Sequence, residues 1–111
     1  MANASAPLGE FEVVVLMAVL HLGADAYGAA ILGEIERRGK RPVARGAVYI
    51  TLDRLEDKGL LASRTGPPTA DRGGRPKRVF RVTAAGIAAV KRSLSLLVHM
   101  HKGLEPLLGD L

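Results

Sequence analysis

The segment from Leu8 to Leu22 carries apolar residues around nearly the whole circumference of the helix that its spacing predicts. One face, built at steps of three and four residues, holds Leu8, Phe11, Val15, Ala18, Val19 and Leu22. The opposite face holds Val13, Val14, Met17 and Leu20. A helix that is apolar on all sides has to be covered on both, by its own domain or by a partner subunit. The fold must therefore bury this helix in a core, at an interface, or in both.

Two further helices are expected in the next part of the chain. The second covers about Ala26–Arg38, with Asp25 as its N-cap and Gly39 at its end. The third covers about Arg45–Lys58 and stops at Gly59. At helical spacing the inward residues of these two helices are Tyr27, Ile31, Ile35, Val48, Leu52 and Leu55. The outward face of the third helix consists of Gly46, Ala47, Ile50, Asp53, Arg54 and Asp57.

After the third helix the period of the pattern changes from 3.6 to 2. Leu60–Thr65 and Lys77–Val82 are predicted to be strands, and Gly66–Pro76 the loop between them. The loop has three Gly and three Pro in eleven residues, yet the flanking segments match in length. It is therefore expected to be the tip of a hairpin and not a linker between domains.

A final helix is predicted to begin at Ala84, capped by Thr83, and to end near Gly103 and Pro106. Its apolar positions follow one another at alternating steps of three and four: Ile87, Val90, Leu94, Leu97, His101 and Leu104. This heptad spacing is typical of the seam between two packed helices. The seam spans about two and a half heptads, so a short helix pair is expected.

The composition limits the class of protein. The chain has 111 residues, the size of one compact domain, and no cysteine, which excludes disulfide scaffolds, zinc fingers and thiol catalysis. Its longest apolar run, Val13–Leu22, is shorter than the about 20 residues that cross a bilayer. No Lys or Arg precedes Arg37, so the start lacks the basic residues of a signal peptide. We expect a soluble, cytoplasmic protein that does not bind membranes.

Charge is unevenly distributed along the chain. Residues 1–36 carry five acids and no base, whereas residues 37–81 carry thirteen bases against four acids. Residues 82–111 carry three bases against two acids. Eleven of the sixteen bases are Arg, which makes forked contacts to phosphate and to guanine edges. A basic middle of this kind indicates a polyanion-binding surface, or else a solvated basic surface.

Three helices followed by a hairpin with a basic tip predict a winged helix-turn-helix, a mainly α fold with a small β-hairpin. An α-helix fits the major groove of B-DNA, and a narrow basic loop can lie on the neighbouring backbone or minor groove. The segment Gly73–Arg78 suits that loop, because its glycines allow close approach and Arg75, Lys77 and Arg78 supply cations.

The chain resembles the PadR-like transcriptional regulators over about residues 8–100. The segments that carry the resemblance are Leu8–Glu12, Ala26–Gly28, Arg45–Tyr49, Thr51–Glu56, Lys58–Leu61 and Gly73–Gly86. The single C-terminal helix is similar to the short form of the family. The resemblance implies a homodimeric, DNA-binding repressor: a flexible tail at 1–7, a winged helix-turn-helix at 8–83, and a dimerisation helix and tail at 84–111.

The resemblance also implies how the dimer forms, because in such proteins the first helix packs against the last helix of the partner. The residues expected at this interface are Phe11, Val14, Leu20, Ile87, Val90, Leu94, Leu97 and His101. A two-fold dimer places two third helices in successive major grooves, about 34–36 Å apart, so the double-stranded operator is expected to be an inverted repeat.

Individual residues of the third helix are assigned as follows. Arg45, at its start, is expected to contact a base edge or a phosphate. Tyr49 is expected to reach a phosphate, to pack, or both, and Thr51 and Arg54 to contact the DNA backbone. Ala47 and Ile50 are secondary candidates for reading bases, Ile50 through a thymine methyl group. Asp53 and Asp57 would repel phosphate, so they mark the end of the helix that points out of the groove, or pair with Arg54 and Lys58.

Catalysis has no support in the sequence, and we predict neither enzymatic activity nor a cofactor. His99 and His101 are two residues apart and point to different sides of a helix, so one chain cannot bind a metal through both. His101 is placed to meet its copy across the dimer seam. Two alternative functions are a sensor, whose dimer is gated by an unknown small molecule, and a winged-helix module that binds only protein. Because the chain has no Trp and 4% aromatic residues, aromatic stacking on an effector is not favoured.

Overall fold

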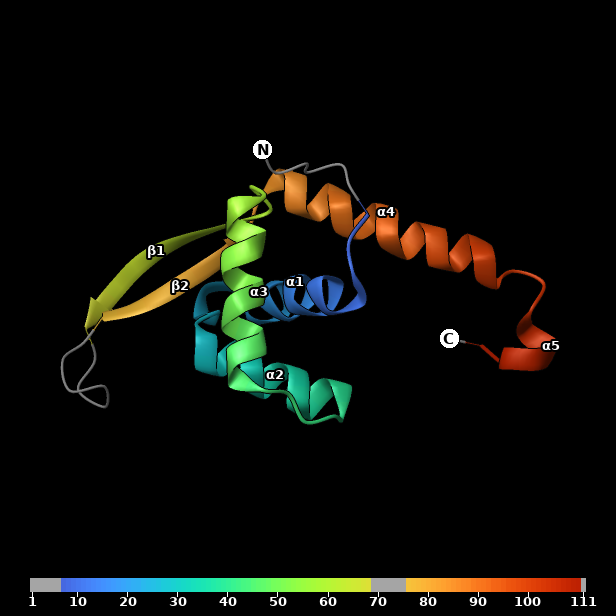
Figure 1. Cartoon of the computed structure of the whole chain (residues 1–111), viewed down its shortest axis with the longest axis horizontal. Helices are drawn as coiled ribbons and strands as arrows, with labels where there is room; N and C mark the ends of the chain where they lie inside the picture. The colour runs from blue at the N-terminus through green and yellow to red at the C-terminus, as the bar shows by residue number, and fades with distance from the viewer. Residues whose placement is uncertain (1–6, 69–75, 111) are drawn as a thin grey trace.

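The computed structural model describes residues 7–68 and 76–110 of the chain. Its elements run in the order α1 (Glu10–Leu22), the 3₁₀ turn η1 (Gly23–Asp25), α2 (Gly28–Gly39), α3 (Arg45–Asp57), β1 (Leu61–Pro68), β2 (Pro76–Val82), α4 (Ala84–His101) and α5 (Glu105–Leu108). Three helices, a hairpin and a long helix follow one another as the sequence predicts, with η1 and α5 in addition. Figure 1 shows the hairpin projecting from one side of the helical body and the end of α4 projecting from the other.

Helix α1 lies at the centre of the body and contacts α2, α3, β2 and α4. Val15 and Leu16 are fully buried on the side that these elements cover. The other side is not covered: Val14 and Met17 are half-buried, and the Leu20 side chain is 47% exposed. The sequence predicts that both sides of α1 are covered, and the chain itself therefore covers one of them.

The core of the domain is formed where α1, α2, α3 and the hairpin meet. The predicted inward stripes of α2 and α3 are confirmed, because Ile31, Ile35, Val48, Leu52 and Leu55 are all buried. Tyr27 is only half-buried. Phe80 of β2 fills the space between the hairpin and the helices. This packing holds α3 with its opposite side facing outward.

The start of α2 differs from the prediction. Asp25 belongs to η1 and does not cap α2, which begins at Gly28 with Tyr27 in the extended N-cap position. Here the chain is held by the hairpin, because Tyr27 forms an isolated bridge with Val79 and the Phe80 amide donates to the Ala26 carbonyl at 2.8 Å. A long-range strand contact thus sets where α2 begins, and a local capping signal does not.

The hairpin is longer than predicted. Strands β1 and β2 pair antiparallel from Leu61 opposite Val82 to Pro68 opposite Pro76, with an irregularity after Thr65. They therefore extend into the segment that was expected to be loop. Because side chains of a strand alternate between its two faces, Ser63 and Phe80 face α3 while Arg64 and Arg81 lie on the far side.

Helix α4 begins at the predicted cap, since the Thr83 hydroxyl accepts a hydrogen bond from the Gly86 amide at 3.1 Å. Its first turns pack on the body through Ala89 and Val90, and the rest of the helix is exposed. Pro106 does not end this helix, because it lies in the first turn of α5. In the part of the chain that the structure describes, no helix is both long and apolar enough to cross a bilayer.

The packing of α4 on the hairpin leads to a prediction for Gly86. A Cβ atom at this position would lie 2.6 Å from Val82 Cγ1 and closer still to the Leu60 carbonyl oxygen. Gly86→Ala should therefore lower the free energy of unfolding by about 1–3 kcal/mol, as overpacking does. Gly33→Ala is the matched control, because a Cβ atom there meets nothing within 4 Å. It should raise the same quantity by roughly 0.5–1 kcal/mol in urea titrations, since Ala favours the helix. Equal effects of both substitutions would contradict the described contact.

Candidate nucleic-acid interface

The outward face of α3, which the sequence analysis singled out, is exposed in the structure. Arg45, Gly46, Ala47, Asp53, Arg54 and Asp57 are all exposed. Ile50 lies among them with 60% of its side chain exposed. The structure therefore brings Arg45, Ala47, Ile50 and Arg54 together on one surface, as predicted.

Thr51 does not belong to this surface. It is 7% exposed and lies on the inner side of α3, beside Val48 and Leu52. The prediction that Thr51 contacts the DNA backbone is wrong, because Thr51 is buried. Its position three residues after Val48 places it at the edge of the buried stripe.

Tyr49 packs at the junction of α3 and α2. A Cβ atom at Gly28 would lie 2.5 Å from the Tyr49 ring, so the absence of a side chain at Gly28 makes room for that ring. Tyr49 is nevertheless 40% exposed. Its packing role is thus confirmed, and its contact with a phosphate stays a prediction.

An ion pair between α1 and α3 fixes the end of α3 that is remote from Arg45. Lys58 Nζ lies 2.7 Å from Glu12 Oε2, and both side chains are largely buried. Burial by itself raises the pKa of Glu12, but the hydrogen bonds from Lys58 and from the Gly9 amide outweigh it, so the pKa lies below its ordinary value. Lys58 therefore pairs with Glu12 and not, as was one expectation, with Asp57.

A second ionic network joins α3 to the hairpin. Arg78 Nη1 donates to Asp53 Oδ1 at 3.1 Å, Nη2 donates to Glu56, and Nε donates to Ser63 Oγ at 3.2 Å. Burial opposes the charged form of Arg78, but these two carboxylates outweigh it and raise its pKa further. Asp53 was expected to pair with Arg54 or to mark the outer end of the helix. It pairs instead with a residue of β2, which the sequence placed at the basic tip.

The other predicted cations of the hairpin have different surroundings. Lys77 Nζ lies 4.1 Å from the centre of the Tyr27 ring, a cation–π contact that holds its stem against the body. Arg75 lies outside the described residues, so its position is not assigned. Lys77 is thus the predicted hairpin cation that the structure leaves without a carboxylate partner among the residues it describes.

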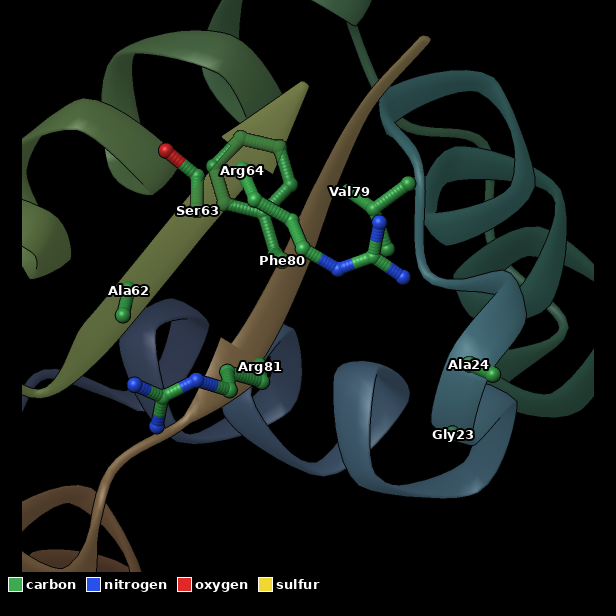
Figure 2. Close-up of a pocket in the computed structure, with 8 residues that line it drawn as sticks. All are labelled: Gly23, Ala24, Ala62, Ser63, Arg64, Val79, Phe80 and Arg81. Carbon is green, nitrogen blue, oxygen red and sulfur yellow. The ribbon is translucent and has the colours of Figure 1, made fainter. Parts of the chain in front are cut away.

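The far face of the hairpin carries two arginines that the sequence analysis did not single out. Arg64 and Arg81 line an open pocket of about 470 Å³, together with Gly23 and Ala24 of η1. In Figure 2 the two guanidinium groups point in opposite directions, so they do not converge on one point. The alternation of side chains within each strand, together with the pairing of Arg64 with Val79 and of Ala62 with Arg81, places both arginines on one face.

Glu34 is a buried carboxylate that the sequence analysis also missed. It is 6% exposed and pairs with Arg38 at 2.6 Å and with Arg37. The hydrogen bond from Arg38 lowers the pKa of Glu34 although burial opposes this. The spacings i, i+3 and i, i+4 could have revealed these pairs. Arg37 and Arg38, two bases of the basic middle segment, therefore form ion pairs within α2.

The residues predicted at the dimer interface fall into two groups. Leu20, Ile87, Leu94 and Leu97 are exposed, and Phe11 and Val14 are half-buried. A cavity of about 390 Å³ between α1 and α4 is lined by residues of both helices, among them Val14, Met17, Leu94 and Leu97. Val14, Met17, Leu20, Leu94 and Leu97 line two neighbouring hollows that share Met17 and Leu94, so they form one apolar surface.

Val90 and His101 do not belong to that exposed group. Val90 is 5% exposed and packs in the core of its own chain. An imidazole nitrogen of His101 lies 2.7 Å from the Gly109 carbonyl oxygen, so α5 and the residue that follows it cover the ring. His101 thus makes a contact within its own chain, and its meeting with the His101 of a second copy stays a prediction.

Comparison with known proteins agrees with this architecture. The model of the transcriptional regulator PadR-like family matches residues 16–92. Transcriptional regulator Rv3488 of Mycobacterium tuberculosis is 43% identical over 84 residues, which cover 73% of this chain and 74% of the relative.

Two solved structures show the same fold. A PadR family regulator from Eggerthella lenta superposes with a TM-score of 0.69 at 24% identity, covering 91% of this chain and 85% of its own. A PadR-like regulator from Bacillus cereus superposes with a TM-score of 0.72 at 16% identity, covering 91% and 93%. The predicted fold class, mainly helical with a two-stranded wing, is confirmed.

The ion pair that anchors α3 predicts a pH dependence. Because the pKa of Glu12 is lowered on folding, its contribution to stability is complete above the ordinary carboxyl pKa of about 4.3 and is lost as the pH falls through the lower folded value. The difference in unfolding free energy between the wild type and Glu12→Gln should therefore be largest near neutral pH and shrink below about pH 4.

Urea titrations at several pH values measure this difference. Asp25→Asn is the control, because the Asp25 side chain is exposed and has no ion pair within residues 7–68 and 76–110. If the difference in unfolding free energy between the wild type and Glu12→Gln does not change with pH, the negative charge of Glu12 does not contribute to stability.

Proposed function

The chain belongs to the transcriptional regulator PadR-like family, and from this premise we propose that it is a homodimeric repressor that binds a specific double-stranded DNA operator. The observation that carries the proposal is the outward face of α3, which lies beside a hairpin with basic side chains. A helix with an exposed outer face fits the major groove, and a neighbouring hairpin reaches the flanking backbone.

In this complex the N-terminal end of α3 enters the groove. Arg45 stands at that end, where a guanidinium group reaches guanine O6 and N7 or a phosphate beside them. Ala47 and Ile50 meet apolar base edges, and Tyr49 and Arg54 contact the backbone from the two sides of the helix. Thr51 has no part in the interface because it is buried.

The hairpin contributes contacts that do not depend on sequence. Lys77 is exposed enough to bind a phosphate, and Arg75, in the segment that is not described, carries the same prediction. Such contacts position the protein on the duplex and supply affinity but no discrimination between sequences.

The dimer is proposed from the apolar surface that one chain leaves uncovered. Leu94 and Leu97 of α4, with Leu20 of α1, are between 38% and 58% exposed. A contiguous surface of this kind on α1 and α4 marks a protein interface. A second copy supplies the matching helices, and its two-fold symmetry accounts for an operator that is an inverted repeat.

Two alternatives carry less weight. A winged-helix module that binds only protein leaves the exposed cations of α3 and the hairpin without a role. A sensor gated by a small molecule uses the same dimer, with the cavity between α1 and α4 as the place where an effector could act. A repressor acts in the compartment that holds its DNA operator. The proposed function therefore agrees with the expected cytoplasmic location.

The role of Arg45 is tested with an operator selected from a random duplex library. If Arg45 contacts a base edge, Arg45→Ala should reduce discrimination between the operator and a scrambled duplex by about 1–3 kcal/mol. Lys77→Ala is the comparison. It should weaken binding to both duplexes equally and make the slope of log K against log salt shallower by about one unit. If Arg45→Ala behaves like Lys77→Ala in fluorescence anisotropy, Arg45 contacts phosphate and specificity comes from other residues or from DNA shape.

The dimer is tested by light scattering. The wild type should have about twice the chain mass of 11.7 kDa at micromolar concentration, and Leu97→Glu should shift the mass toward one chain. Ile50→Glu is the matched control: Ile50 and Leu97 are 60% and 58% exposed, but Ile50 lies on α3. It should remain dimeric. A monomeric wild type, or a dimeric Leu97→Glu variant, contradicts the proposed interface.

A further inference from the structure

We propose that Arg78 is a positioning residue, which acts with Asp53, Glu56 and Ser63 to hold the hairpin at a set angle to α3 so that helix and wing reach DNA as one rigid unit. This inference rests on the proposed DNA-binding function. It assigns Arg78 a role different from the phosphate contact that its place in the basic segment suggested.

Each of the three nitrogens of the Arg78 guanidinium group donates a hydrogen bond. Its three nitrogens donate to Ser63, Asp53 and Glu56, and its flat face lies over the Phe80 ring, 4.7 Å from the ring centre. Ser63 Oγ in turn donates to Glu56 Oε2 at 2.7 Å, so both strands of the hairpin bind the same carboxylate. These hydrogen bonds use three of the five N–H groups of Arg78, whose side chain stays 48% exposed. A phosphate that approached Arg78 would meet the carboxylates of Asp53 and Glu56 beside it.

The charges of the network also oppose phosphate binding. One guanidinium faces two carboxylates, so the group as a whole is negative. These carboxylates stand on α3 at positions three residues apart, which places them on neighbouring turns of the same face. Arg78 therefore spans one turn of α3 and fixes the strand against it.

The network acts on the outer half of the hairpin. Its inner half is tied to the body independently, by the bridge between Tyr27 and Val79 and by the hydrogen bond from Phe80 to Ala26. Figure 1 shows the strands projecting away from the helices. Arg78 follows Val79 in β2 in the direction of the hairpin tip. Without the network, the outer half of the hairpin has no ionic contact with α3 among the described residues.

Two interpretations of Asp53 predict opposite changes in DNA binding when Asp53 is replaced by Asn. If Asp53 only repels phosphate, Asp53→Asn should strengthen binding to DNA. If it holds Arg78, the same substitution should weaken binding to the selected operator by about threefold to tenfold, a coupling usual for one network of ion pairs. Asp57→Asn is the matched control, because Asp57 is exposed on the same helix and has no ion pair in residues 7–68 and 76–110. It should leave operator binding unchanged or slightly stronger.

The salt dependence of Arg78→Ala separates positioning from phosphate contact. A lost phosphate contact makes the slope of log K against log salt shallower by about 0.9. A lost positioning contact weakens operator binding and leaves the slope on a scrambled duplex as in the wild type. A shallower slope for Arg78→Ala, together with stronger binding by Asp53→Asn, overturns the inference.

Hydrogen exchange without DNA gives a readout that does not depend on the proposed function. Amides of the outer hairpin should exchange faster in Arg78→Ala and Asp53→Asn than in the wild type and in Asp57→Asn, while the amides of α1 remain protected. If the wild type binds no duplex, the proposed function fails and these exchange rates still decide whether the network holds the hairpin. Unchanged exchange rates in both network variants overturn the inference.

Discussion

Burial of α1 is the contact on which the other elements depend. One side of this helix, with Val15 and Leu16 at its centre, meets α2, α3, β2 and α4. Each Å² of apolar surface removed from water contributes about 25 cal/mol, so the helix that touches most elements supplies a large share of the stability. Because α3 packs on this side through Val48 and Leu52, its opposite face points outward. On its other side the same helix leaves Leu20 exposed. Helix α1 therefore contributes both to the core of one chain and to the proposed dimer surface.

The carboxylates of the body organise the basic surface. Glu34, Glu12 and the pair Asp53 and Glu56 each form ion pairs with cations from the basic middle segment. Each such cation is neutralised locally and contributes little to the field that attracts a polyanion. The cations that stay without an ion pair in the described part of the chain include Arg45 on α3 and Arg64, Lys77 and Arg81 on the hairpin. Among the described residues, cations without an ion pair thus remain on α3 and on the hairpin.

The sequence predicted best those features that depend on neighbours in the chain. The inward residues of α3 and the cap at Thr83 follow from spacing and from a hydroxyl before a helix, and the structure confirms both. Predictions failed where a distant element intervened. Asp25 has the chemistry of a cap, but the pairing of Tyr27 with Val79 moves the start of α2. Thr51 stands at the edge of a stripe, and the packing around α3 decides that its side chain is buried.

By itself, the sequence determined the order of the elements, the buried stripes and the basic hairpin, because periodicity, caps and turns act over a few residues. The tertiary structure alone decided which charges pair between distant segments and which side of α1 stays open. Lys58 meets Glu12 across 46 positions and Arg78 meets Asp53 across 25. No local pattern specifies such pairs, since they form only after the apolar stripes have packed and brought these side chains together.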